Sequence, residues 1–136
     1  MKFFVARIAI ALSMLFVIEN VHSRELREVS LIQLITHPTE FDGQDVRAIG
    51  FLHLEFEGNA VYLHREDFEY SNLKNAVAIT LSATQLRAWS KLNNRFVIVE
   101  GKFDSSSSGH LNAMSGSFRV ISRLDSWPAR ATRSKN

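Results

Sequence analysis

The residues whose side chains could bind a metal or catalyse a reaction lie mostly around one predicted hairpin. Histidines are the first group to consider. His53 and Glu55 fall on one face of a predicted strand, and His64 lies on the strand that returns. We expect His64 to approach His53 or Glu55 across the hairpin, while His110 could reach them from a later loop. Three imidazoles and a carboxylate could hold zinc, as in a metal-dependent hydrolase. Exposed strands often carry His and Glu, however, and nothing fixes His110 near the others, so we expect no metal and no cofactor.

Acidic residues flank the same hairpin and the segment that follows it. They are Glu55, Glu57, Glu66, Asp67 and Glu69. Paired carboxylates can cleave a glycosidic bond, but that chemistry needs a deep cleft, which this pattern does not predict. The sequence has no glycine-rich phosphate loop, no GxSxG, no HExxH and no cysteine. We therefore predict no enzymatic activity, and the acidity favours a cationic protein or peptide partner.

The elements that must position these side chains follow from hydrophobic periodicity and helix caps. Ser30 with Gln33 and Ser82 with Gln85 fit capping boxes, each of which opens a helix. Apolar alternation predicts five strands, over residues 45–56, 60–64, 76–81, 95–103 and 117–124. Three meandering strands, a helix and two further strands is the order of the OB-fold, a five-stranded Greek-key barrel. We predict this mainly β fold, and a mixed α+β sandwich is the alternative that the same pattern could build.

The predicted strands also carry detailed expectations about which side chains face inward. In the first strand Val46, Leu52, Leu54 and Phe56 share one face, and Gly50 marks a bend or bulge. In the last strand we expect one inward face, made of Phe118, Val120 and Leu124. On the second strand Tyr62 is the one aromatic residue expected to point outward.

Four segments together resemble a known family. They are HPTEFDGQDVRAIGFLHLEFEGNAVYLHRED, KNAVAITL, FVIVEGKFD and GHLNAMSGSF. The set is similar to small secreted bacterial proteins related to OB-fold domains of the tRNA-anticodon-binding-like type. The resemblance covers roughly residues 30–127 and implies an OB-fold in a periplasmic or secreted protein. It implies no reaction and no established ligand.

A binding surface is the function that these residues predict best. It would combine the first hairpin, the polar segment 65–75 and the loop 104–116, which takes the place of an OB-fold ligand loop. The residues predicted to bind a ligand are Glu55, Glu57, Asn59, Tyr62, His64, Asn75 and His110. The tyrosine would supply contact area, the acids complementary charge, and the amides and histidines hydrogen bonds. We expect a protein, peptide or small envelope ligand, and a protective or inhibitory role is one version of this hypothesis.

The first 23 residues have the features of a secretory signal peptide. Lys2 and Arg7 give a positive start, and the apolar run from Ile8 to Ile18 is too short to span a bilayer. A buried N-terminal helix is the alternative. We expect cleavage after Ser23, a periplasmic or secreted location and no membrane span in the mature chain. The predicted organisation is a signal peptide (1–23), a helical segment (24–44), a barrel (45–127) and a basic disordered tail (128–136).

The charge of the chain changes sign when it is divided along these boundaries. The whole sequence has a net charge of +2 and a pI of about 9.2, which is typical of nucleic-acid-binding proteins. Between the signal and the tail, residues 24–127 carry 11 basic and 13 acidic residues. The excess of positive charge thus lies in the two termini, and nucleic acid is an improbable partner for the barrel. Polyanion binding, to nucleic acid or lipopolysaccharide, remains an alternative through the tail with Arg119 and Arg123.

Overall fold

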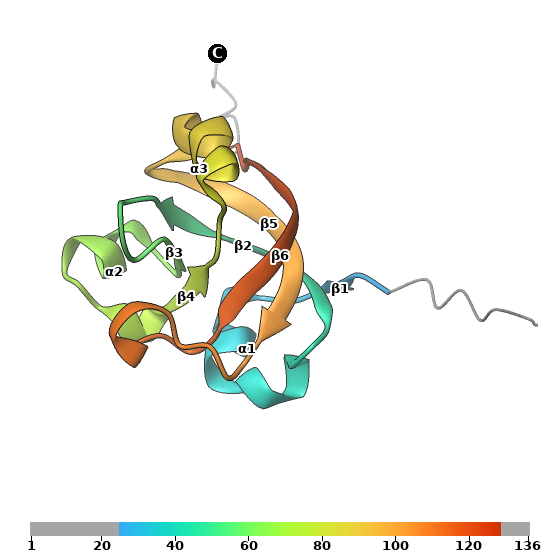
Figure 1. The fold of residues 1–136 in the computed structure, drawn as a ribbon. Helices are drawn as coiled ribbons and strands as arrows, with labels where there is room; N and C mark the ends of the chain where they lie inside the picture. Colours follow the sequence, from blue (N-terminus) through green and yellow to red (C-terminus); the bar gives the residue numbers. More distant parts are fainter. Residues whose placement is uncertain (1–24, 129–136) are drawn as a thin grey trace, which may run out of the picture.

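Five strands close into an OB-like barrel in the computed structural model, which describes residues 25–128 (Figure 1). They are β2 (Asp45–His53), β3 (Ala60–Tyr62), β4 (Ala76–Ile79), β5 (Arg95–Asp104) and β6 (Ser117–Ser126). The sheet order is β2-β3-β4-β6-β5, and pairing of β2 with β5 closes the ring. Only the β4–β6 pair in this ring is parallel. The predicted mainly β, five-stranded barrel is confirmed, and the α+β sandwich is wrong.

The long strand β2 pairs on both sides, which is what allows the barrel to close. Its register with β5 is unbroken from Asp45 to Leu52, and its last three residues also pair with β3. A two-residue strand that the sequence did not predict, β1 (Arg27–Glu28), adds to the other end of β2 in parallel. Two residues are too short to show an alternating pattern.

Of the bend or bulge that we predicted at Gly50, the bulge is absent, and the register shifts lie between β5 and β6. The register shifts twice beside Gly101, so that residues 117–126 of β6 face only residues 97–104 of β5. Phe118, Ile121 and Leu124 are therefore the buried apolar residues of β6, and Val120 is 65% exposed. The predicted inward orientation of Val120 is wrong because each bulge reverses the alternation.

Gly50 has a different role, since it allows other groups to approach β2 closely inside the barrel. A Cβ atom at this position would lie 2.5 Å from Val61 Cγ1 and 2.8 Å from the Tyr62 carbonyl oxygen. It would also lie 3.0 Å from Leu31 Cδ2 of helix α1 (Leu31–Thr36). The missing side chain therefore leaves space for both the neighbouring strand and the helix.

Two capped helices cover opposite ends of the barrel (Figure 1). In α1 the Ser30–Gln33 capping box is present, and Leu31 and Leu34 are buried in the core. The Ser82–Gln85 box opens α3 (Ala83–Trp89), which ends in a 3-10 turn, Ser90–Leu92. Both predicted capping boxes are confirmed. Among the described residues, no helix is long and apolar enough to cross a membrane.

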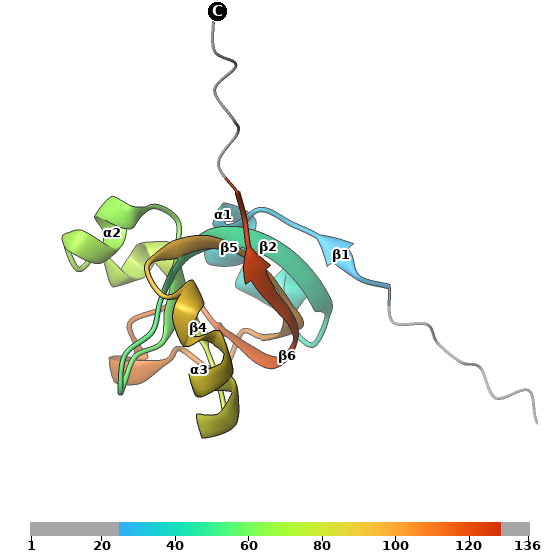
Figure 2. The same cartoon turned by 90° about the horizontal axis from the view of Figure 1, so that it is seen from above.

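The segment between β3 and β4 folds into a third short helix, α2 (Arg65–Glu69), and a 3-10 turn, Leu73–Asn75. Seen from above, α2 lies on one side of the barrel and β1 on the opposite side (Figure 2). The sequence predicted only a polar excursion here. The expected signal peptide and almost all of the expected tail fall outside the described residues.

Candidate functional site

The outer face of β3 and β4 is covered by the chain itself. A second hydrophobic cluster fills this face, separate from the barrel core. It contains Phe51, Ala60, Tyr62, Ala76, Ala78 and Met114, with Phe68 and Leu73 packed against them. In OB-folds that bind single strands, stacking aromatics lie on open faces of this kind. Here α2, the 3-10 turn after it and the loop around Met114 occupy the face instead.

The predicted outward position of Tyr62 is wrong for this reason. The residue is 4% exposed, and its ring lies 5.6 Å from that of Phe68, edge to face. Burial, together with the negative charge of Glu55, raises the pKa of the Tyr62 phenol. Tyr62 holds α2 on the barrel and cannot supply contact area to a ligand.

Two other predicted site residues, His64 and Asn75, meet at the carboxylate of Asp67. Oδ1 of Asp67 accepts hydrogen bonds from the side-chain amides of Asn75 (2.8 Å) and Asn72 (3.0 Å). Oδ2 accepts from the backbone N–H of His64 (3.0 Å), and His64 Nδ1 lies 3.3 Å away. Desolvation alone would raise the pKa of Asp67, but these hydrogen bonds together lower it. The cluster therefore fixes the 64–75 segment, which leaves the Asn75 amide committed to the fold.

The hairpin tip after β2 carries the remaining predicted site residues, Glu55, Glu57 and Asn59. The strand ends at His53, three residues before its predicted end, because the Asn93 side chain pairs with both backbone groups of Leu54, at 2.8 and 3.0 Å. Asn59 Oδ1 accepts the backbone N–H of Glu55 at 2.9 Å and so closes the turn. The tip, defined as residues 55–59, is therefore fixed from both ends.

Phe56, at the centre of the hairpin tip, is the residue that the sequence analysis missed. We predicted that it shares a strand face with Val46, Leu52 and Leu54, but it is 95% exposed because the strand ends before it. It stands between the exposed residues Glu55 and Glu57. The signal that could have located it is the sequence Glu-Phe-Glu-Gly-Asn, in which a hairpin turn begins at the first acid rather than the second.

His53 is held in place beside the hairpin tip. Its ring stacks on that of Phe68 with centroids 3.8 Å apart, and Nδ1 lies 2.8 Å from Asn94 Oδ1. Nε2 points to Glu55 Oε2 at 3.7 Å. His53 therefore links β2, α2 and the tip through three different contacts.

The predicted convergence of His53 and His64 is wrong. Opposite His53 the β2–β3 register places Ala60, and His64 lies four residues further along, paired with Asp67. Among the side chains that the structure describes, no three histidines or acids come close enough to hold a metal ion. The backbone of His110 begins a 3-10 turn, His110–Asn112, and its side chain is outside the described part.

The hairpin tip and the 104–116 loop both contribute to the lining of one hollow. Between them lies a shallow hollow of about 240 Å³, which Asn59, Thr80, Ser107 and Ser117 help to line. The serine run is anchored rather than free, since Ser105 bonds to Asp42 and Ser106 to Asp104. The hydrogen bond from Ser106 is the largest cause of the lowered pKa of Asp104. Segment 65–75 is separated from this hollow and acts as a cover for the barrel face.

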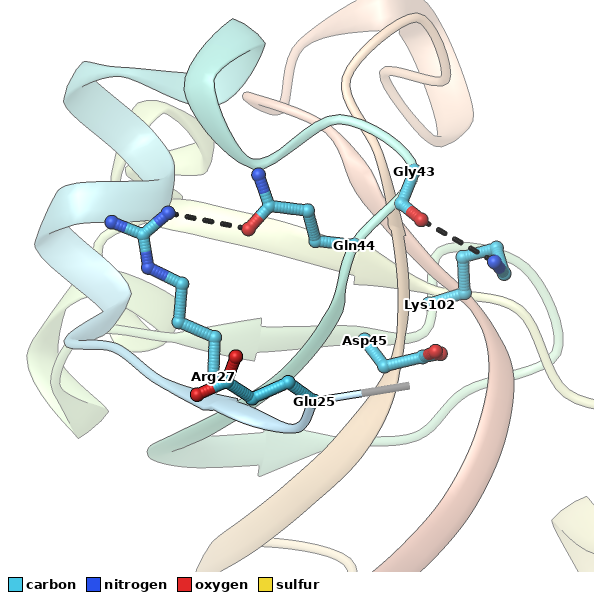
Figure 3. Close-up of a pocket in the computed structure, with 6 residues that line it drawn as sticks. All are labelled: Glu25, Arg27, Gly43, Gln44, Asp45 and Lys102. Atoms are coloured by element: carbon cyan, nitrogen blue, oxygen red, sulfur yellow. Dashed lines mark hydrogen bonds between the residues drawn. The ribbon is translucent and has the colours of Figure 1, made fainter. Parts of the chain in front are cut away.

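A larger hollow beside β1 is a mixed-charge junction between elements (Figure 3). Arg27 extends from β1 and donates a hydrogen bond to Gln44 Oε1 at 3.2 Å, and Lys102 donates to the Gly43 carbonyl at 3.3 Å. Arg27 also lies over the Phe41 ring, 4.8 Å from its centroid. The contacts of Arg27 join β1 to the barrel. The cationic groups of Arg27 and Lys102 both make contacts within the fold.

Arg119 and Arg123, the two arginines of the polyanion alternative, both lie beside acids. Arg123 bonds to Asp125 at 2.6 Å and to Glu100 at 3.2 Å, and both contacts raise its pKa. Arg119 lies 3.8 Å from Asp104. Acids of β5 and β6 therefore partner the arginines of the last strand, which does not present a purely cationic face.

Comparison with known proteins adds no relative. A scan against models of protein families gives no match, and a search of curated proteins gives none either.

Proposed function

We propose that this chain is an exported, non-catalytic OB-like module that binds a protein or peptide partner through its hairpin tip. The observation that carries the proposal is Phe56, a fully displayed aromatic ring between two exposed carboxylates. Large aromatic side chains that bury themselves in a partner's pocket contribute much of the affinity at protein interfaces. The flanking acids select a partner with basic residues around that pocket.

The rigidity of the hairpin tip supports this proposal. Asn59 closes the turn, Asn93 holds Leu54, and His53 is fixed between Phe68 and Asn94. A turn already in its bound conformation loses little conformational entropy on association. Burial of the Phe56 ring in a partner can therefore add to the affinity, because no free energy is needed to order the turn that carries the ring.

Export is the second part of the proposal, and it rests on residues 1–23. Their positive start and apolar run are typical of a signal peptide, and a chain without cysteine cannot mispair in an oxidising compartment. An exported single domain with an exposed aromatic side chain at a fixed turn suits a protective or inhibitory role, in which it covers the active surface of an envelope protein. Fractionation followed by N-terminal sequencing tests export, and the expected first residue is Arg24.

The partner hypothesis is tested by crosslinked capture from envelope extract with matched variants. We expect wild type and Val120→Ala to retain the same protein, and Phe56→Ala to lose it. Val120 is the control because it is also an exposed apolar residue, but it lies on β6. Glu55→Gln with Glu57→Gln should weaken capture and reduce its dependence on salt. Equal capture by all variants, or no retained protein, would show that the hairpin tip is not the binding surface.

A further inference from the structure

A third hollow lies where α2 meets the ends of β5 and β6, and it shares no lining residue with the hairpin tip. Its volume is about 560 Å³, which is within the usual range for small-molecule sites. The residues that matter for its chemistry are Arg65 from α2, Arg95 and Phe96 from β5, and Trp127, which follows β6. No acidic residue is among those that line it.

The two arginines differ from other arginines of the barrel because their guanidinium groups have no acidic partner within residues 25–128. Arg47, Arg119 and Arg123 each lie within 4 Å of a carboxylate. The Arg65 guanidinium instead lies over the ring of Phe51, with 5.1 Å between its Cζ atom and the centroid. Stacking of this kind orients a guanidinium while leaving its N–H groups free to donate.

The apolar part of the hollow consists of two partly exposed aromatic rings. Phe96 is 38% exposed and Trp127 is 46% exposed. The Phe96 ring meets Phe51 edge to face at 5.8 Å, and the backbone N–H of Trp127 donates to the Phe96 carbonyl at 2.8 Å. The Phe96 ring and the Trp127 backbone are thus held in place, and both side chains line the same hollow as the arginines and are partly exposed.

The surrounding charge favours an anion. Residues 25–128 carry more acidic than basic residues, yet this hollow has two cations of its own. Positive charge gathered on one part of a protein raises the local concentration of anions.

We propose that this hollow binds a small anion attached to a flat ring, such as an aryl phosphate or an aryl carboxylate. Arg65 and Arg95 bind the anionic group, because a guanidinium matches the oxygens of a phosphate or carboxylate with two parallel hydrogen bonds. Phe96 and Trp127 contact the ring. The site is independent of the hairpin tip, so it stands whether or not that surface binds a partner.

Calorimetric titration of the purified protein tests this site with four probes. Phenyl phosphate and phenylacetate carry both features and distinguish a phosphate ligand from a carboxylate. Inorganic phosphate has no ring, and benzyl alcohol has no charge. We expect at least one ring-bearing anion to bind about tenfold or more tightly than either single-feature probe. Quenching of tryptophan fluorescence, lost in Trp127→Phe, should accompany it.

Variants identify the groups responsible. Arg65→Gln and Arg95→Gln should each weaken binding about tenfold, whereas Arg87→Gln, at an exposed position of α3 outside the hollow, should not change it. All three changes remove one positive charge from an exposed side chain. The site is overturned if no ring-bearing anion binds at millimolar concentration or if the three variants bind equally. It is also overturned if removal of residues 129–136 abolishes binding while Arg65→Gln and Arg95→Gln leave it unchanged.

Discussion

The imidazole of His53 stacks on the phenyl ring of Phe68, with 3.8 Å between the ring centroids and 24° between the planes. This pair joins β2 of the barrel to α2, two elements that the chain separates by a hairpin. Phe68 also contacts Phe51 at 6.2 Å and Tyr62 at 5.6 Å. One side chain of α2 thus contacts three rings of the barrel, and it organises the cover over β3 and β4.

Replacing Phe68 with alanine should therefore destabilise the protein by about 2–4 kcal/mol, because the change removes three ring contacts and leaves a cavity under α2. The measurement is the free energy of unfolding in urea. Phe56→Ala is the matched control, since it makes the same change at an exposed ring and should cost no more than about 0.5 kcal/mol. Equal losses in the two variants would show that α2 does not depend on this packing.

Asp67 should make stability depend on pH in the acid range. Its pKa is lower in the folded chain than in the unfolded chain, where a carboxyl of this type titrates near about 3.9. The stabilisation is therefore complete above that value and is lost as the pH falls through the folded pKa. We expect Asp67→Asn to be less stable than wild type at pH 7, with a difference that shrinks toward pH 3.

Urea unfolding of both proteins from pH 3 to 7 measures this dependence, and Glu69→Gln serves as a control at an exposed position of the same helix. The control should differ from wild type by a small amount that varies little with pH. A constant gap between wild type and Asp67→Asn across the range would mean that the hydrogen bonds of Asp67 do not favour its ionised form.

Gly50→Ala should cost about 1–3 kcal/mol, because the added Cβ atom meets Val61, the Tyr62 backbone and Leu31 at once. Gly43→Ala is a useful comparison, since no atom lies within 4 Å of a Cβ there but the residue has φ +71°. Its cost should be the backbone strain alone, about 1–2 kcal/mol. Thermal unfolding would distinguish the cases further, because second-site Leu31→Ala should relieve part of the Gly50→Ala crowding and none of the Gly43→Ala strain.

Retention on heparin should not depend on the arginines of β6. Arg119 and Arg123 lie beside Asp104, Glu100 and Asp125, so Arg119→Gln with Arg123→Gln should leave the eluting salt concentration nearly unchanged. Replacing Arg130, Arg133 and Lys135 by glutamine should lower it, since these residues have no acidic neighbour in sequence. A larger effect from the β6 pair would place polyanion binding on the barrel.

The parts of the fold that were predictable are those specified by local sequence. Both capping boxes need residues three positions apart. The position of each strand along the chain follows from apolar alternation within its own segment. The failures have distant causes. Strand β2 ends early because Asn93, 39 residues away in sequence, binds Leu54, and Val120 turns outward because of the bulges opposite β5.

The candidate site was predictable to a similar extent. Glu55, Glu57 and Asn59 lie on the hairpin as the turn signal predicts. Tyr62 was misplaced because its burial depends on a ring contributed by α2. Asn75 was assigned to a ligand because a single sequence does not reveal that its amide is already bound to Asp67.

The cover over β3 and β4 has a consequence for the shape of any molecule that recognises the hairpin tip. The face on which other barrels hold a ligand is filled by side chains of this chain, and Phe56 projects outward from a fixed turn. The partner must then supply the concave half of the contact, a socket as deep as one phenyl ring with basic residues at its rim. A candidate partner can therefore be identified from its own structure, by a pocket of this depth with a basic rim, without a binding experiment.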